Sequence, residues 1–377
     1  MVIKSAPSIK NINKEAVLNF IYQKRATTQQ AIKEYLQLSR PTIIQIIKEL
    51  EDDGLVEKNG FLESTGGRKA SKLCFIQNSK LSIGVEILAD RYEIVTLNLF
   101  GETIKSQKYI CDFVNSNEYY QSLCQSINTY IESEDYGQDN IIGVGIVLQG
   151  LISSDGCQVT YGKILNCTGL DISTFKQYLP YQCKFFHDAE SAALDELWQS
   201  PLLKNAIYIQ IRTNMSGAII VDREFLKGHE LKSGVFEHMT IVPNGNLCYC
   251  GNRGCLDTYC STKSLINSFG SLENFFTELR QGNKLAHDIW LEYLHFLAIA
   301  INNLHMFMDC DVIIGGTISP YLQGSDLTRL HKYVYENTAF PSEREFIKAS
   351  RCPGSPISRG PALFYIKEYL SELLGTF

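Results

Sequence analysis

Apolar residues near the start of the chain recur three and four positions apart, which is the spacing of helices that bury one face. The pattern predicts three helices, around residues 12–22, over residues 29–36, and from residue 40 to a boundary at Gly54. Thr28 is placed to cap the second helix and Ser39 to cap the third. Pro41 falls in the first turn of the third helix, where proline is tolerated, and residues 37–38 form the turn between the two helices.

Two runs after the third helix, residues 55–57 and 72–76, are expected to be strands, and a basic glycine-containing segment lies between them. Three helices followed by a hairpin are the order of a winged helix-turn-helix, whose second motif helix enters the major groove of DNA. Residues at the start of that helix contact bases and phosphates, and here they are Ser39, Arg40, Thr42, Ile43 and Gln45. Glycines 66 and 67 would let Arg68 and Lys69 approach a phosphate or a minor groove. A helical protein-interaction module is the alternative for this segment.

Beyond residue 78 the pattern changes to apolar runs of strand length that alternate with longer helical segments. Strands are expected over residues 81–87, 92–99, 106–110, 141–148, 184–186, 206–212, 217–221 and 311–316. Helices are expected over residues 119–132, 189–197, 290–306 and 362–374. The second half repeats the arrangement of the first, so the fold class is α/β, with two similar lobes around a cleft. The expected domains are residues 1–78, residues 79–190 with the terminal helix of 362–377 packed on them, and residues 191–361.

Charge is unevenly distributed along the 377 residues, whose formal net charge is −6. Residues 1–80 carry a formal charge of +5 and the remainder −11, so only the first segment is suited to meet a polyanion such as DNA. The composition, 45% hydrophobic and 20% charged, is that of an ordinary globular protein. The chain has no apolar run of membrane-spanning length and no signal-peptide pattern, so we expect a cytoplasmic protein without a membrane partner.

Three of the twelve cysteines fall within eight residues, Cys248, Cys250 and Cys255, and His238 precedes them by ten positions. One imidazole and three thiolates are a closed tetrahedral donor set typical of structural zinc, with no position open for a catalytic water. Cys260 is a further candidate ligand. A disulfide is disfavoured by a reducing compartment and by the odd number of cysteines in the motif. We therefore expect zinc as the cofactor.

Several segments in fixed order resemble the ROK family (repressors, open reading frames and kinases), and in particular its repressor branch of xylose- and N-acetylglucosamine-type sugar regulators. They are Ser39-Arg-Pro-Thr42, Ser64-Thr-Gly-Gly-Arg68, His187-Asp-Ala189, His238 with Cys248-x-Cys250-Gly-x-x-Gly-Cys255-Leu-Asp257, and Ile313-Ile-Gly-Gly-Thr317. The resemblance covers nearly the whole chain. It implies an actin/hexokinase-like (ribonuclease H-like) two-lobed ROK body behind the winged helix, and it implies the same four zinc ligands.

Kinases of this family hold ATP phosphates in two glycine-rich turns that this chain lacks. The first resembles Asp-x-Gly-Gly-Thr, and the matching stretch here is Glu86-Ile-Leu-Ala-Asp90. The second resembles Gly-Thr-Gly-x-Gly, and the matching stretch is Arg212-Thr-Asn-Met-Ser216. A third element, residues 314–317, is intact. Because positioning and charge stabilisation supply most of phosphoryl-transfer catalysis, we expect no enzymatic activity.

The family's sugar site is only partly kept. The resemblance assigns effector contacts to His187, Asp188, Glu237, His238 and Asp257. Asp188 matches the kinases' general base, whereas His187 replaces an asparagine, Glu237 a glycine, and Val235 a sugar-binding glutamate. These changes predict a small sugar-like effector that differs from the common hexoses; the alternative is a vestigial pocket in a dimerisation scaffold.

The resulting expectation is a DNA-binding transcription regulator, more often a repressor in this family, that controls carbohydrate-related genes. A homodimer or tetramer would bind a roughly palindromic double-stranded operator. Two alternatives remain: a ROK sugar kinase with a DNA-binding head, and a DNA-binding protein that responds to no effector.

Overall fold

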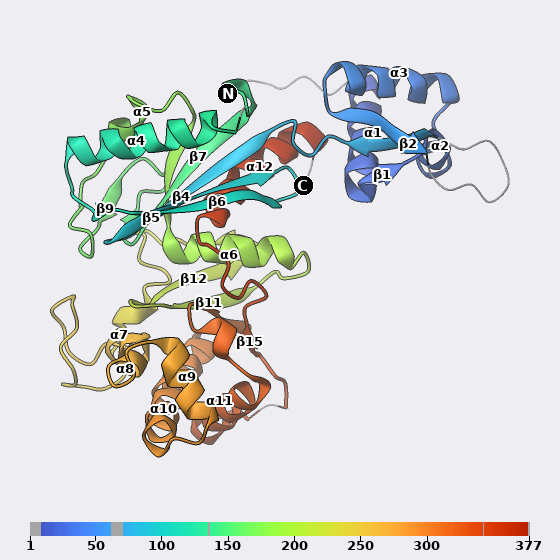
Figure 1. Ribbon diagram of the computed structural model, residues 1–377. Coiled ribbons are helices and arrows are strands. Elements are labelled where there is room, and N and C mark those ends of the chain that lie inside the picture. The colour runs from blue at the N-terminus through green and yellow to red at the C-terminus, as the bar shows by residue number, and fades with distance from the viewer. Residues whose placement is uncertain (1–8, 62–70, 135, 342, 376–377) are drawn as a thin grey trace.

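The computed structural model describes residues 9–61, 71–134, 136–341 and 343–375. Its first part, which we call the head, contains the helices α1 (Ile9–Lys24), α2 (Gln29–Leu36) and α3 (Arg40–Asp52). The strands β2 (Val56–Phe61) and β3 (Ser71–Phe75) form the hairpin of the wing, and β1 (Ala26–Thr27) adds a third strand in the order β1-β3-β2 (Figure 1). The sequence pattern did not predict β1, because two residues are too few to show a period.

The helix boundaries of the head follow from local hydrogen bonds. The Thr28 hydroxyl accepts from the amide of Ala31 at 3.1 Å, and the Ser39 hydroxyl accepts from the amide of Thr42 at 3.3 Å. Satisfying these otherwise unpaired amides fixes where α2 and α3 begin. Four side chains of α3 pack inward and build the head core, namely Ile43, Ile46, Ile47 and Leu50.

The first lobe of the body contains a mixed five-stranded sheet in the order β10-β7-β4-β5-β6. The strands are β4 (Leu81–Ile87), β5 (Arg91–Asn98), β6 (Thr103–Ile110), β7 (Ile141–Leu148) and β10 (Cys183–His187). Helix α4 (Asn117–Glu132) covers one face of this sheet, and α12 (Arg359–Leu374) covers the other. Smaller elements, β8 (Leu151–Ile152), β9 (Val159–Tyr161), α5 (Ser173–Lys176) and the 3-10 turn η1 (Gln138–Asn140), complete the lobe.

The second lobe contains another five-stranded sheet, in the order β13-β12-β11-β14-β15. Its strands are β11 (Ala206–Ile211), β12 (Ser216–Val221), β13 (Glu224–Phe225), β14 (Asp311–Gly316) and β15 (Ile347–Ala349). Helix α6 (Asp188–Gln199) lies between the two sheets (Figure 1). The remaining helices and turns are η2 (Phe236–His238), α7 (Asp257–Cys260), α8 (Lys263–Ile266), α9 (Leu272–Arg280), α10 (Lys284–Phe307), η3 (Ser319–Tyr321) and α11 (Gly324–Asn337).

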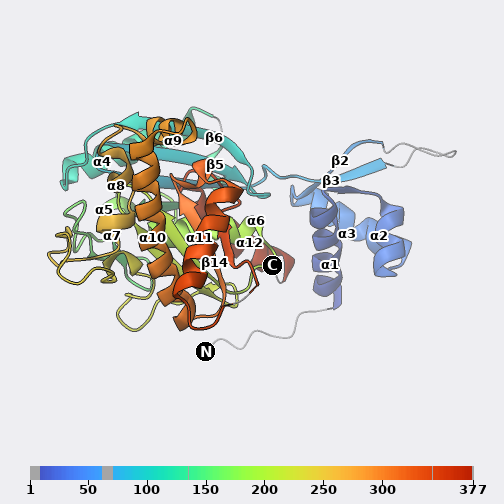
Figure 2. The same cartoon turned by 90° about the horizontal axis from the view of Figure 1, so that it is seen from below.

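The terminal helix α12 returns from the second lobe to the first and lies very close to its sheet. A Cβ atom on Gly84 would lie 1.6 Å from the carbonyl oxygen of Ser358, so the strand residue facing the start of α12 must be glycine. The other end of α12 packs against the head, and Leu370 and Leu374 belong to the same apolar cluster as Leu18 of α1. In Figure 2 the head lies beside the body and meets it along one edge. Among the described helices, none is long and apolar enough to cross a membrane.

Candidate functional site

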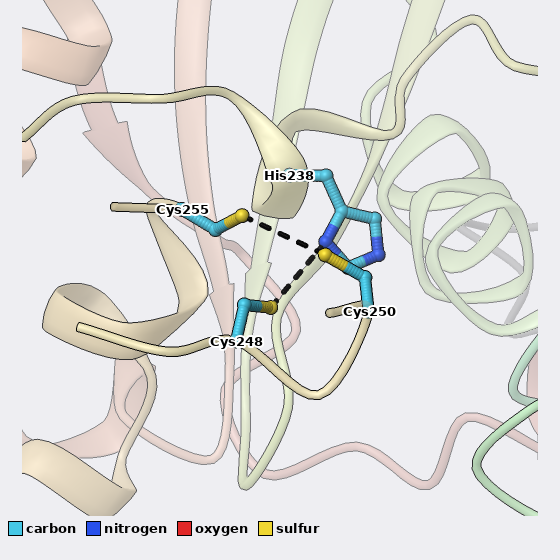
Figure 3. Close-up of side chains that lie close together, drawn as sticks. All are labelled: His238, Cys248, Cys250 and Cys255. Carbon is cyan, nitrogen blue, oxygen red and sulfur yellow. Dashed lines mark hydrogen bonds between the residues drawn. The ribbon is translucent and has the colours of Figure 1, made fainter. Parts of the chain in front are cut away.

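His238, Cys248, Cys250 and Cys255 converge at one point, and their four donor atoms all lie within 4.8 Å of one another (Figure 3). The Sγ of Cys248 is 3.7 Å from Nδ1 of His238, and the Sγ of Cys250 is 3.7 Å from that of Cys255. Two thiolates bound to one zinc ion at about 2.3 Å would be roughly 3.8 Å apart at the tetrahedral angle. The donor set and its spacing therefore fit a tetrahedral metal ion.

The loop that carries the cysteines is shaped by its own backbone. The amide of Cys248 donates to the carbonyl of Asn252 at 2.8 Å and closes a tight turn in which Gly251 has φ +98°. Gly254 has φ +81°, and a Cβ there would lie 1.8 Å from the carbonyl oxygen of Val242. Only glycine tolerates both this conformation and this contact, so Gly254 brings Cys255 back to the other donors.

A cavity of about 450 Å³ lies beside this His and Cys cluster, between loops of the first lobe and the edge of the second. Four of the five residues expected to contact an effector line it: His187, Asp188, Glu237 and His238. Residues of the first lobe that belong to no sequence motif also line the cavity, among them Gln149, Tyr161 and Lys163. Their convergence depends on how the lobes pack, and no local sequence signal marked them. Cys250 and His238 belong both to the donor set and to the cavity wall.

Asp188 begins α6 and is 2% exposed. Its Oδ2 accepts from the hydroxyl of Ser216 at 3.1 Å, and its Oδ1 lies 3.5 Å from Nε2 of His187. A buried carboxylate held by hydrogen bonds at a helix N-terminus is stabilised in one orientation. Asp188 can therefore accept a hydrogen bond from a ligand hydroxyl at a fixed place on the cavity floor.

Glu237 is 8% exposed, and among the described residues its Oε2 has no hydrogen-bond partner. Burial raises the pKa of Glu237 to about 8, and the nearby carboxylates of Asp188 and Asp257 act in the same direction. An unsatisfied buried carboxyl oxygen is costly, so a ligand that supplies the missing partner gains affinity. Val235, two residues earlier, lines the same cavity with an apolar side chain.

Asp257, the fifth residue expected to contact an effector, lies apart from this cavity wall. Its Oδ1 accepts from the backbone amide of Met215 at 2.7 Å, and it is not among the described residues that line the cavity. Asp257 therefore holds the backbone of the turn of residues 212–216 in place.

That turn also contacts the opposite lobe. The guanidinium of Arg212 forms an ion pair with the carboxylate of Glu86, and both side chains are largely buried, at 13% and 5% exposed. Burial raises the pKa of Glu86, while the Arg212 charge opposes this shift. The residues that match the kinases' two phosphate turns thus bind each other.

The outer face of α3 carries most of the residues expected to read DNA. Ser39, Arg40 and Gln45 are exposed, and Thr42 is half-buried with its hydroxyl 2.7 Å from that of Ser39. Ile43 was a wrong assignment, because it is 1% exposed and packs in the head core. Ile44, which is 46% exposed, occupies the outer face instead. Arg68 and Lys69 lie outside the described residues.

Comparisons with known proteins agree with this architecture. Residues 82–350 match the ROK family model, and residues 16–65 match a MarR family model. The chain is 23% identical to the putative xylose repressor of Caldicellulosiruptor sp. over 87% of this chain and 88% of that protein. It is 27% identical to the xylose repressor of Bacillus subtilis over 72% of each chain. It is 24% identical to the DNA-binding transcriptional dual regulator NagC of Escherichia coli over 82% of each.

Two solved structures share the fold. A ROK family transcriptional regulator, described as a homologue of the E. coli MLC protein, has a TM-score of 0.76 at 22% identity and covers 97% of this chain and 98% of its own. A ROK family glucokinase from Streptomyces griseus, in complex with glucose and AMPPNP, has a TM-score of 0.63 at 20% identity, covering 75% of this chain and 98% of its own. The match to the family model spans well over half of the chain, and the two-lobed body with its cysteine loop agrees with it. The chain therefore belongs to the ROK family.

Proposed function

We propose that the protein is a DNA-binding transcriptional repressor of carbohydrate-related genes, and that its ROK body binds a small sugar-like effector without phosphorylating it. The observation that carries the proposal is that one chain contains both a winged helix and a ROK body. The recognition helix of the winged helix exposes polar residues. Relatives that are named as a putative xylose repressor and as N-acetylglucosamine repressors match this chain across both parts.

DNA binding rests on the outer face of α3. Arg40 and Gln45 can donate hydrogen bonds to base edges, and the capped N-terminus at Ser39 presents free amides to a phosphate. Gln45 donates to Glu49 at 3.1 Å, and Glu49 in turn pairs with Lys10 of α1 at 2.8 Å. These contacts hold the glutamine side chain before DNA arrives, which reduces the ordering cost of binding.

The effector would bind in the cavity next to the metal centre. Asp188 and Glu237 offer hydroxyl-binding oxygens from the floor, and Lys163, Tyr161 and Tyr249 offer donors and flat rings from the sides. Aromatic faces and carboxylates together suit a polyhydroxylated ring, whose two faces are apolar and whose edge is polar. The apolar Val235 favours a ligand with one hydroxyl fewer or a modified group at that side.

Absence of kinase activity is part of the proposal. The Met215 amide, in the stretch that matches the second phosphate turn, donates to Asp257. The Arg212 side chain from the same stretch pairs with Glu86. A phosphate in this position would have to displace both contacts and would meet the Glu86 carboxylate.

We assign the donor set to zinc. His238, Cys248, Cys250 and Cys255 would hold it, and the ion would supply structural cross-linking of the loop with no open coordination position. The cavity wall at Cys250 and His238 would then be rigid. Because a two-fold operator is read by a two-fold protein, we also propose a homodimer or a dimer of dimers.

Selection of DNA from a random duplex pool by the purified full-length chain tests the proposal. We expect the selected duplexes to share a two-fold symmetric sequence motif. We also expect one sugar from a panel of pentoses, hexoses and amino sugars to release the protein from such a duplex. An ATP-consumption assay over the same panel should give no turnover. Failure to enrich any duplex contradicts the DNA-binding function, and sugar-dependent ATP turnover contradicts the non-enzymatic one.

A further inference from the structure

The turn between β5 and β6, residues 99–102, is the surface on which the head rests. The Tyr22 hydroxyl of α1 donates to the carbonyl of Leu99 at 3.0 Å. Arg25 pairs with Glu102 at 2.5 Å, and its guanidinium lies 4.3 Å from the centre of the Phe100 ring. The head is therefore fixed to this turn by a hydrogen bond, an ion pair and a cation–π contact within four residues.

The opposite side of the same turn packs against the body helices α6 and α12. Gly101 has φ +73°, and a Cβ there would lie 2.6 Å from Nε1 of Trp198 on α6 and 2.8 Å from Leu363 on α12. The turn is thus held between the head and two body helices, and it transmits displacements of α6 to the head beside the direct contact of α12 with α1. Figure 1 shows α12 extending from the body toward the head, with α6 beneath the sheet.

Arg359, the first residue of α12, joins these parts through four hydrogen bonds. Its Nε donates to Oδ2 of Asp195 at 2.9 Å, and its Nη2 donates to Oδ1 of the same carboxylate at 3.2 Å. Nη2 also donates to the Gly101 carbonyl at 3.0 Å, and Nη1 donates to the Thr103 hydroxyl at 2.5 Å. The Arg359 and Asp195 side chains are 11% and 5% exposed, so the pair is shielded from water.

Asp195 belongs to α6, the helix that begins at the cavity residue Asp188. Two helical turns separate the two aspartates, and an α-helix of this length moves as a rigid rod. One guanidinium therefore connects the helix that bears Asp188 to the turn that bears the head. Lysine could not replace it, because a single ammonium lacks the planar fork that serves a carboxylate, a carbonyl and a hydroxyl together.

We propose that Arg359 is a positioning residue that fixes the orientation of the DNA-binding head relative to helix α6 and its cavity end. The consequence of this positioning is a defined spacing between the two half-sites of an operator, and this consequence rests on the proposed DNA-binding function. It concerns contacts within one subunit and does not depend on which effector is bound.

Hydrogen exchange of the full-length chain tests the positioning directly. In Arg359→Met, amides of α1 should exchange roughly tenfold faster than in the wild type, because the turn under the head loses its anchor. Arg359→Lys should give a smaller increase. Arg280→Met is the matched control: Arg280 also binds a buried aspartate, Asp326, through two nitrogens, but it lies in the second lobe away from the head. Unchanged α1 exchange in Arg359→Met, or an equal increase in the control, would overturn the proposal.

Operator spacing supplies a readout that a purely structural role would not change. Duplexes carrying two copies of the selected half-site, separated by spacers varied one base pair at a time, would be bound by each variant. The wild type should prefer one spacing. Arg359→Met should bind a single half-site as tightly as the wild type does, but it should bind duplexes of all spacings with similar affinity. Retention of a sharp preference in Arg359→Met counts against the role. If the wild type selects no DNA, the proposed function fails, while the exchange measurement still decides the role of Arg359.

Discussion

Arg212 and Glu86, separated by 126 positions in the sequence, form a buried ion pair that joins the two lobes of the body. Glu86 is the next-to-last residue of the central strand of the first sheet, and Arg212 directly follows the central strand of the second. The family resemblance aligns both residues with the stretches that form phosphate turns in the kinases. A cavity of about 170 Å³ remains beside the pair, and the larger cavity next to the four His and Cys donors is separate from it.

Removing one partner of this pair should destabilise the body. Arg212→Met leaves the Glu86 carboxylate buried without its counter-charge, and we expect a loss of about 3–5 kcal/mol in the free energy of unfolding by urea. The double variant Glu86→Gln/Arg212→Met should lose clearly less. Equal losses in the two variants would contradict an ion-pair contribution.

The stability of the single variant Arg212→Met should depend on pH, and the direction of this dependence follows from Glu86. Burial raises the pKa of Glu86 in the folded state, and loss of Arg212 removes the opposing charge. The folded state then binds the proton more tightly than the unfolded state, so stability is lost as pH rises above about 4.3, the ordinary glutamate value. Unfolding by urea at pH 5 and pH 8 should show a larger deficit at pH 8. A deficit that is independent of pH would exclude Glu86 as its cause.

Metal content should depend on the cysteine loop. The purified chain is expected to contain one zinc per chain by elemental analysis, and Cys250→Ser should lose it and melt at a lower temperature. Cys111→Ser, at an exposed cysteine outside the donor set, is the control and should keep its zinc. Full zinc content in Cys250→Ser would refute the ligand assignment.

Operator recognition should depend on Arg40. Arg40→Ala should weaken binding to the selected duplex by about 1–3 kcal/mol and relax the preference at the contacted base pair. Arg329→Ala makes the same charge change at an exposed site on α11 and should leave affinity unchanged. An identical selected motif for wild type and Arg40→Ala would show that Arg40 reads no base.

Two adjacent isoleucines of α3 should behave in opposite ways. Ile43→Ala creates a cavity in the head core and should cost about 2–5 kcal/mol of head stability in urea unfolding. Ile44→Ala removes an exposed side chain and should leave stability within about 0.5 kcal/mol, while weakening operator binding if Ile44 packs on a thymine methyl. Gel-shift titration together with unfolding separates the two effects. A stable Ile43→Ala head would contradict the assigned packing.

Features set by neighbouring residues were predictable from sequence. Thr28 and Ser39 cap the helices that follow them because a side-chain oxygen reaches an amide three residues on, whatever the rest of the fold does. The cysteine loop was predictable for a similar reason, since thiolate spacing and two glycines specify a tight turn around one centre. Ile43 was expected to contact DNA only because it lies at the start of the recognition helix. Its helical spacing already favoured the core, so position near a helix start does not by itself distinguish exposed residues from buried ones.

The sequence by itself indicated the winged helix, the two α/β halves and the four clustered His and Cys residues, because each of these rests on periodicity or on spacing within one short segment. Only the tertiary structure decided that Asp257 accepts a hydrogen bond from the Met215 amide. It also decided that Lys163 and Tyr161 line the cavity, that Arg212 meets Glu86, and that Arg359 joins α6 to the turn beneath the head. These partners lie far apart along the chain, and their meeting depends on the packing of whole sheets and helices, which no local pattern encodes.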